Sequence, residues 1–425
     1  MAPLTRPLLT CAGLLALSLA GCDCTSGQSA CTPACGVGFV CDEDARVCVS
    51  TQLDLYELAM PGRGAQIVQT QQGPLVAAIA PTQRSVIINP PADAPRLLAQ
   101  DVRAGSSNLE LAQGPQQTLV LWINSQGSYT LAEHTGDDFS RNWRVGPLPM
   151  PAPSAASDDA DVAVAIDGSV HVVARDTSTG SLVHLWRPSP EEPWSREVVD
   201  DGRTKLAPDP CPQTTRTQQS QGVGREPSLL AAPSGELVVA YQDADCGDLR
   251  VARKGDVEWV VGLVDRGVSL DAQGGFSVTG RWPSLALFDD RIGISYQDFT
   301  LGRLMFAQSS AQGFDIEVVD PGVGLDLFSK RPKKIVGAFT HLSFDAQGAP
   351  LISYFDATDT ALMTARAGAR SPRTWTLRAR ASEGLVGFFA THARLDSGSV
   401  QFVCEQLTPS DQGVQSALLS IEEAP

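Results

Sequence analysis

The sequence of 425 residues has no long apolar run after its first 20 residues and no excess of basic side chains. Because about 20 apolar residues are needed to cross a bilayer, we expect no membrane-spanning helix beyond that point. Asp and Glu number 48 against 32 Lys and Arg, so the formal net charge is −16. An acidic chain without a basic stripe is a poor match to a phosphate backbone, which argues against a nucleic-acid partner.

Short motifs of common enzyme classes are also missing. The chain has no G-x-S-x-G elbow, no H-E-x-x-H, no P-loop and no paired C-x-x-C, so it lacks the usual signatures of a serine nucleophile, a zinc ion or a nucleotide phosphate. None of its five histidines stands at helical metal-ligand spacing to another; they are His134, His171, His184, His341 and His392. We therefore predict no catalytic residue, metal or cofactor, and favour a binding protein over an enzyme.

The first residues have the form of an export signal. Arg6 precedes an apolar segment, residues 7–20, that is too short to span a membrane. The segment ends in Leu19-Ala-Gly-Cys22, and this tetrapeptide resembles the lipobox of bacterial lipoproteins. The resemblance implies a signal peptide of residues 1–21, attachment of lipid to Cys22 and anchoring in a membrane of the bacterial cell envelope. The membrane stays open, with the outer membrane or cell surface favoured; ordinary secretion, with Cys22 in a disulfide, is the alternative.

Residues 22–50 are dense in cysteine. Besides Cys22 they contain Cys24, Cys31, Cys35, Cys41 and Cys48. In an exported chain, disulfides at such density replace a hydrophobic core, so we interpret residues 31–48 as a small disulfide-stapled module that separates the anchor from the next domain. Four cysteines allow three pairings, which stay open. A zinc knuckle is the less favoured alternative, because no histidine is nearby.

Residues 280–308 predict three short strands in a row. Residues 283–287 and 292–296 flank an Asp-Asp turn, and residues 303–307 follow a second break. A fourth strand is expected at residues 316–319. Four strands joined by tight turns form an antiparallel sheet that needs copies of itself to pack against.

This pattern recurs along most of the chain. Second strands of the copies are expected to begin near Pro74, Thr118, Ser169, Glu236, Arg291, Pro350 and Ser399. A period of roughly 45 to 65 residues falls at or a little above the length of a four-stranded β-propeller blade. We therefore predict an all-β chain in which residues 51–425 form a propeller of seven four-stranded blades, with six as the alternative.

The repeated pattern P-S-L-A…I-S-Y-x-D…L-x-x-A resembles the blades of bacterial secreted propellers, some of them related to sialidases. What this resemblance implies is the fold. The chain has no Phe-Arg-Ile-Pro motif and no complete Asp-box, which argues against sialidase activity.

The last copy, residues 391–421, ends before its fourth strand. Residues 52–58 alternate between apolar and polar side chains. We predict that they supply this outer strand, which would close the ring and leave no open sheet edge.

Three connections between copies are long, at residues 200–224, 264–280 and 320–334. Each joins the outer strand of one predicted blade to the inner strand of the next, so all three lie on one face, which we call the connection face. Cys211 and Cys246 both map to this face, and we predict a disulfide between them that would pin the first long connection.

Cys404 stands where the clearest copies have Tyr241, Tyr296 and Tyr354. Two interpretations stay open for it. It is either a buried free thiol that fills less space than tyrosine, or the disulfide partner of Cys24.

Candidate ligand-binding residues precede or begin the innermost strands, around the mouth of the central channel. Arg225 and Arg281 occupy equivalent places, where guanidinium groups would suit a carboxylate, sulfate or phosphate. The alternative is structural, an arginine paired with an Asp of a neighbouring blade.

A second set of candidates would line the channel itself. Ser228, Ser284, His341 and His392 are aligned as equivalent positions, with Asp161 by a looser alignment. Such a ring could hold a polar ligand or a metal. The alternative is that these side chains satisfy backbone groups and water.

Together these features predict a monomeric, lipid-anchored protein whose propeller binds or scaffolds a glycan or an envelope protein. The alternative is a glycan-processing enzyme, a hydrolase or lyase, with its site at the channel mouth. A pair of carboxyl groups at the separation used by glycosidases would favour the enzyme.

Overall fold

The computed structural model describes residues 39–42, 47–50, 63–91, 94–139, 142–151, 160–203, 222–255, 258–270, 276–323, 334–410 and 413–423. Within these ranges every regular element is a β-strand, and there is no helix of the length and apolarity that a membrane crossing requires. The strands pair into six four-stranded sheets, one three-stranded sheet and a separate two-stranded ribbon.

Each of the seven larger sheets is a blade whose strands follow one another in chain order. The inner strands are β3 (Arg63–Thr70), β7 (Leu109–Gln113), β11 (Ala160–Val164), β15 (Val223–Ala231), β19 (Arg281–Phe288), β23 (Val336–Phe344) and β27 (Leu385–Arg394). The second strands are β4 (Gly73–Ala80), β8 (Gln117–Ile123), β12 (Val170–Asp176), β16 (Leu237–Asp243), β20 (Arg291–Asp298), β24 (Pro350–Asp356) and β28 (Val400–Ser410). We number the blades 1 to 7 in this order.

The remaining strands complete the blades toward the outside. The third strands are β5 (Ser85–Asn89), β9 (Ser128–Thr135), β13 (Ser181–Arg187), β17 (Asp248–Lys254), β21 (Arg303–Ser310), β25 (Ala361–Arg366) and β29 (Gly413–Glu423). The outer strands are β6 (Arg96–Ala99), β10 (Arg144–Pro151), β14 (Ser195–Asp200), β18 (Trp259–Asp265), β22 (Gly313–Asp320) and β26 (Thr376–Ala381). All pairings between neighbouring strands within the blades are antiparallel.

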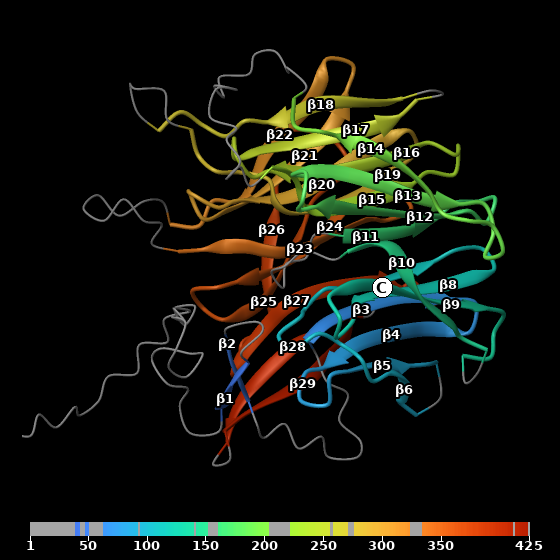
Figure 1. Cartoon of the computed structure of the whole chain (residues 1–425). Helices are drawn as coiled ribbons and strands as arrows, with labels where there is room; N and C mark the ends of the chain where they lie inside the picture. Colours follow the sequence, from blue (N-terminus) through green and yellow to red (C-terminus); the bar gives the residue numbers. More distant parts are fainter. Residues whose placement is uncertain are drawn as a thin grey trace, which may run out of the picture.

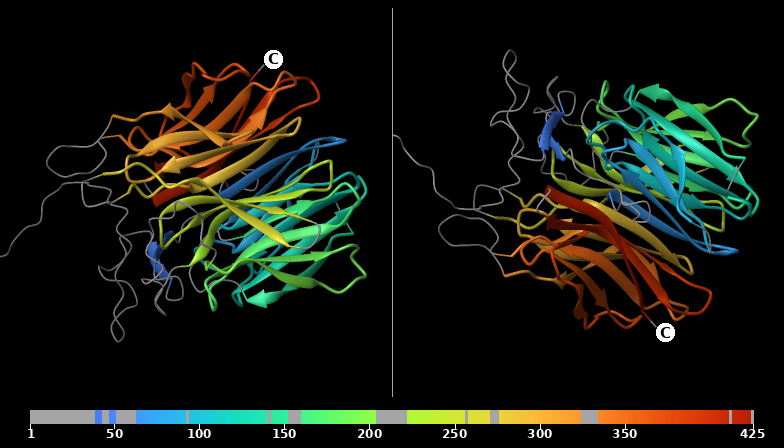
Figure 2. Two further views of the ribbon diagram at one scale, coloured as in Figure 1. Left: turned by 90° about the horizontal axis from the view of Figure 1, so that it is seen from above. Right: turned by 90° about the horizontal axis from the view of Figure 1, so that it is seen from below.

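The blades form a closed ring. Each inner strand contacts the inner strand of the next blade, and β27 of blade 7 contacts β3 of blade 1. Figures 1 and 2 show the same closure, with the red sheet of blade 7 beside the blue sheet of blade 1. The structure therefore confirms the β-propeller with seven blades and excludes the alternative of six.

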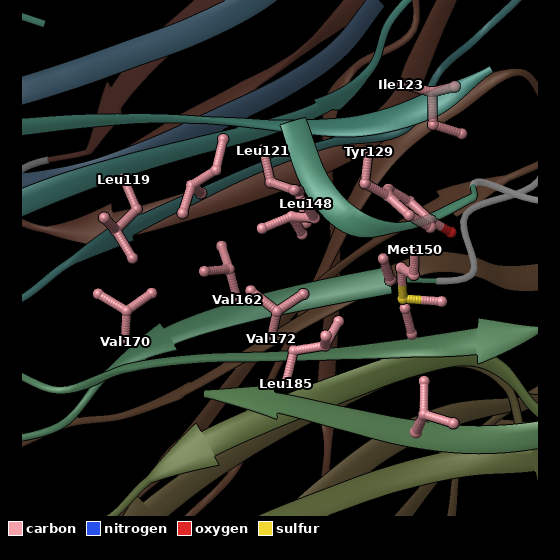
Figure 3. Close-up of a cluster of buried hydrophobic side chains, with 14 residues drawn as sticks. Leu119, Leu121, Ile123, Tyr129, Leu148, Met150, Val162, Val170, Val172 and Leu185 are labelled. Carbon is pink, nitrogen blue, oxygen red and sulfur yellow. The ribbon is translucent and has the colours of Figure 1, made fainter. Parts of the chain in front are cut away.

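The hydrophobic core is divided among the seven interfaces between blades, with one cluster of buried side chains in each. Figure 3 shows the cluster between blades 2 and 3, where Leu119 and Leu121 of β8 face Val162 of β11 and Val172 of β12. A sheet alternates its side chains between two faces, so each blade packs against both neighbours. No blade holds a complete core of its own.

Some predictions lie outside the described residues. These are the lipidated Cys22, the cysteines Cys24, Cys31, Cys35 and Cys211, and the outer strand expected at residues 52–58. In the ribbon of β1 (Phe39–Asp42) and β2 (Val47–Ser50), the register places Cys41 opposite Cys48. Cys246 is disulfide-bonded, as predicted for this residue.

A repeated hydrogen bond joins successive blades at three interfaces. The hydroxyl groups of Tyr241, Tyr296 and Tyr354, on second strands, donate to Asp200, Asp265 and Asp320 at 2.8 Å each. These aspartates are the last residues of the preceding blades' outer strands. Each bond ties the middle of one blade to the outer edge of its neighbour.

Blade 7 departs from this pattern in both partners at once. Cys404 holds the tyrosine position, and the residue equivalent to the aspartates is Ala381 of β26. Both belong to the apolar cluster between blades 6 and 7. Cys404 is a free, fully buried thiol, so the first of its two interpretations is correct and the disulfide to Cys24 is not formed. Burial raises the pKa of this thiol to about 12, which keeps it protonated.

The tyrosine–aspartate bond predicts coupled losses of stability. Tyr354→Phe and Asp320→Ala should each lower the free energy of unfolding by about 1–3 kcal/mol, because each leaves a buried partner without its hydrogen bond. The double variant should lose less than the sum, as measured by denaturant unfolding. Asp315→Ala, at an exposed position of the same strand, is the control and should change stability by less than about 0.5 kcal/mol. Strictly additive losses would show that the bond contributes nothing.

Candidate functional site

The inner strands surround a cavity of about 270 Å³ at the centre of the propeller. All seven blades line it, through the half of each inner strand that lies toward the connection face. Its lining residues include Gly64, Gln66, Glu110, Asp161, Glu226, Ser228, Trp282, Ser284, Phe339, His341, Phe389 and Thr391. This is where the sequence placed the candidate site.

Five of the inner strands contain the same β-bulge. At each bulge the pairing with the second strand slips by one residue, and one residue has a positive φ. These residues are Gly64, Glu226, Trp282, Phe339 and Phe389, with φ of 60°, 50°, 47°, 52° and 53°. The left-handed conformation costs a non-glycine residue about 1–2 kcal/mol. A bulge re-aims a side chain, and here all four non-glycine side chains line the cavity.

A glycine two residues before the bulge lets the chain pass close to the preceding blade. A Cβ at Gly280 would lie 2.8 Å from the Cα of Leu249, and one at Gly337 would lie 2.9 Å from the Cα of Leu304. Neither glycine position has room for a side chain. The spacing from this glycine to the bulge residue is constant, and it is the sequence signal that could have identified Trp282, Phe339 and Phe389, which the sequence analysis missed.

Aromatic side chains form one side of the cavity. Trp282, Phe339 and Phe389 come from the successive blades 5, 6 and 7, and we call them the aromatic arc. Ring centroids of Trp282 and Phe339 are 5.0 Å apart, and those of Phe339 and Phe389 are 4.7 Å apart. All three are only partly buried, so ring surface faces the cavity. The Thr340 hydroxyl donates to the Trp282 carbonyl at 2.9 Å and fixes the backbone there.

Carboxyl groups from blades 2, 3 and 4 also line the cavity: Glu110, Asp161 and Glu226. Asp161 accepts backbone N–H bonds from Val162 and Leu229, each at 2.6 Å. Burial is the largest influence on its carboxyl and raises its pKa to about 7, against the opposing effect of those two bonds. At neutral pH this group is therefore close to half-protonated.

The predicted polar ring ties neighbouring inner strands together. Asp161, Ser228 and Ser284 each accept the backbone N–H of the next blade, from Leu229 at 2.6 Å, Leu285 at 3.1 Å and Leu342 at 3.0 Å respectively. This supports the structural alternative for these positions. The same three residues also line the cavity.

His392 is not equivalent to His341, which corrects the sequence alignment. The register pairs His341 with Ser353 in blade 6 and Thr391 with Val403 in blade 7, so Thr391 is the equivalent residue. The sequence alignment matched the Thr-His dipeptides at residues 340–341 and 391–392, but in blade 7 this dipeptide stands one residue later after the preceding glycine. His392 is buried between blades 6 and 7, with its Nδ1 2.9 Å from the Ser353 hydroxyl and 3.3 Å from the Nδ1 of His341.

Arg225 and Arg281 lie beside Glu226 and are not among the cavity-lining residues. The Nε of Arg281 donates to Glu226 Oε2 at 2.8 Å, and the same oxygen accepts the Trp282 N–H at 2.8 Å. The Nε of Arg225 is 3.9 Å from Glu226 Oε1. Arg281 therefore pairs with a carboxylate of the neighbouring blade, as in the structural alternative, although the partner is a glutamate and not the expected aspartate. Anion binding by either arginine stays a prediction.

Among the described residues, no group of three or more His, Cys, Asp or Glu side chains is arranged to hold a metal ion. The site therefore consists of a cavity with an aromatic arc on one side, carboxyl groups on another, and hydroxyl groups between them.

No protein-family model matches the sequence, and no curated protein matches it significantly. Solved structures do resemble the fold. The BP39L lectin from Burkholderia pseudomallei is 16% identical, with a TM-score of 0.58 over 86% of this chain and 99% of that one. A protein of unknown function from Dyadobacter fermentans is 12% identical, with a TM-score of 0.49 over 87% and 98%. The Aleuria aurantia lectin is 13% identical, with a TM-score of 0.42 over 73% and 95%. The first likeness agrees with the propeller architecture.

Buried neutral histidines predict a loss of stability in acid. Burial lowers the pKa of His341 to about 4, and burial followed by the nearby His184 charge lowers the pKa of His171 to about 4. Since the unfolded chain binds these protons near pH 6.5, each histidine should favour folding above that pH and oppose it increasingly down to about pH 4. His341→Gln and His171→Gln should therefore each flatten the fall in unfolding free energy between pH 7 and pH 4.

The measurement is denaturant unfolding across this pH range, compared between each variant and the wild type. The comparison is needed because the raised pKa of Asp161 has the opposite effect: its protonation raises the free energy of unfolding as the pH falls below about 7. The two histidines lie in different blade interfaces, so their effects should add in the double variant. Unchanged slopes in both variants would contradict neutral burial.

Proposed function

We propose that the protein is a glycan-binding module of the bacterial cell envelope that holds its ligand in the central cavity. One observation carries this proposal: the cavity combines an aromatic arc from blades 5 to 7 with carboxyl groups from blades 2 to 4 and with hydroxyl groups. A sugar ring presents C–H groups on its faces and hydroxyl groups at its rim. The faces pack on aromatic rings, while the hydroxyls donate to carboxylates and serines.

The size of the cavity fits one or two sugar units. Its volume of about 270 Å³ is just below the range of typical ligand pockets, which span about 300–1,000 Å³. We therefore expect it to accept the end of a chain or a single unit. The fold shared with a lectin is compatible with this function, but the lining of the cavity carries the argument, since a fold hosts many functions.

Anchoring is the second part of the proposal and rests on the sequence. The Leu19-Ala-Gly-Cys22 tetrapeptide supports lipidation of Cys22, and the cysteine-rich residues 22–50 would then space the propeller from the membrane. Such a tether keeps a binding domain at the envelope, with the outer membrane or cell surface favoured.

A glycan-processing enzyme is the second candidate, and Asp161 is the observation that favours it. A carboxyl with a pKa of about 7 can act as a general acid at neutral pH. Glu226, which is ion-paired with Arg281, and Glu110 line the same cavity and supply further carboxyl groups. Turnover of any glycan that binds, abolished by Asp161→Asn, would favour this candidate.

Glycan binding is tested on an array of bacterial and cell-wall glycans with the mature chain from residue 22, carrying Cys22→Ser to prevent lipidation. Trp282→Ala should weaken binding of any hit by at least about tenfold, because stacking on an aromatic side chain contributes at least about 1.4 kcal/mol. Trp186→Ala is the control, since Trp186 packs on His184 in blade 3 and does not line the cavity. An equal loss in both variants, or no glycan bound at all, would overturn the proposal.

Lipid anchoring is tested in a bacterial host by membrane fractionation and by mass spectrometry of the N-terminal peptide. The wild type should sediment with the envelope and carry acyl groups on Cys22, whereas Cys22→Ser should not be acylated. Cys24→Ser is the control, because it removes a neighbouring cysteine but leaves the tetrapeptide intact. Acylation that survives Cys22→Ser would refute the assignment.

A further inference from the structure

The charge of the cavity wall limits which glycans it can hold. Glu110, Asp161 and Glu226 approach it from three successive blades, and no Lys or Arg is among the lining residues that the structure describes. A ligand carboxylate or sulfate would therefore face carboxyl groups without a lining cation to bind it. Like charges in a confined site repel strongly, since little water screens them.

The carboxyl group of Asp161 has no positively charged partner among the described residues. Both of its oxygens accept backbone N–H bonds, from Val162 and Leu229, and no ion pair to it is formed within the described residues. The other titratable groups that line the cavity are Glu110, Glu226 and His341. His341 is neutral above about pH 4 because burial lowers its pKa to that value. None of these groups supplies a positive charge.

The pKa of Asp161 reflects this environment. Burial raises it to about 7, and no cation is among the causes that act on it. A bound cation would favour the ionised carboxylate and lower this pKa, as an opposite charge nearby does in general. Binding of a cation in the cavity and loss of the Asp161 proton are therefore linked.

The aromatic arc also suits a cation. The faces of aromatic rings carry partial negative charge and attract ammonium and guanidinium groups. The guanidinium of Arg281 already lies over the Trp282 ring, 4.4 Å from its centroid. The same rings can pack the apolar face of a pyranose. A ligand that carries an ammonium group on a sugar ring would use both properties at once.

We propose that the ligand of the central cavity is a glycan unit with a free, protonated amino group, a hexosamine without its acetyl group, whose ammonium pairs with Asp161. This inference rests on the proposed function, because it names the class of glycan that the same site binds. It also predicts discrimination against uronic acids and sulfated sugars.

Two ligands of equal length distinguish the preference for an amino sugar from glycan binding in general. Isothermal titration of the mature chain carrying Cys22→Ser should show that the glucosamine tetramer binds at least about tenfold more tightly than the N-acetylglucosamine tetramer. A hydrogen-bonded charge pair contributes about 1.5–3 kcal/mol, which corresponds to at least tenfold. Equal affinities, or binding of other array glycans but neither tetramer, would overturn the amine preference and leave glycan binding in place. A chain that binds no glycan at all fails both proposals.

The variants must exclude simple attraction between a cation and an acidic protein. Asp161→Asn should abolish the preference for the amine, whereas Asp290→Asn should keep it. Asp290 is exposed in the turn between β19 and β20, outside the cavity, so both substitutions remove one potential negative charge. A preference lost equally in both variants, or eliminated in the wild type by 0.5 M salt, a concentration that screens surface attraction to within about 4–5 Å, would overturn the pairing.

A measurement on the wild type covers the case in which Asp161→Asn does not fold. At pH 6 the amine is protonated and Asp161, with a pKa of about 7, is mostly protonated as well. Binding should therefore release close to one proton per site, measured by titration in buffers of different ionisation enthalpy. The N-acetylated tetramer should release none. Amine binding without proton release would rule out Asp161 as the partner.

Discussion

Each blade of this propeller has two faces that its own strands cannot cover, and only the neighbouring blades can bury them. The seven apolar clusters all lie between blades, so the stability of any one sheet depends on the two beside it. The contact of β27 with β3 completes this dependence by giving the first and last blades a partner. Ring closure is therefore the constraint from which the rest of the structure follows, including the width of the channel.

Hydrogen bonds between blades act together with the apolar packing and fix how neighbouring strands are positioned. Tyrosine–aspartate bonds tie second strands to the outer edge of the preceding blade, and Asp161, Ser228 and Ser284 tie inner strands to the next blade. Apolar contact alone is tolerant of sliding, whereas hydrogen bonds fix a register. With the inner strands held in this way, four non-glycine residues can keep the left-handed backbone conformation that directs their side chains to one cavity.

The sequence predicted the fold well because each repeat shows clear strand and turn propensities. Every second strand begins within one residue of its predicted start, from Gly73 to Val400. The buried free thiol of Cys404 was one of the two interpretations of its place in the repeat. The site was harder, because β-bulges shift the register by one residue and change which side chain faces the channel. The bulge hid the aromatic arc. The misalignment of His392 has another cause, because the Thr-His dipeptide of blade 7 stands one residue later after its glycine than that of blade 6.

By itself the sequence determined the architecture: alternation of apolar residues, tight turns and a period that only stacked sheets can satisfy. The positions of the long connections followed from the same reasoning, since strand order in a blade fixes them. The tertiary structure alone decided the chemistry of the site. Whether Arg281 faces a ligand or Glu226, whether Asp161 has a counter-charge, and which rings meet across three blades all depend on residues 50 or more positions apart. Such distances are set by ring closure, which local sequence does not encode.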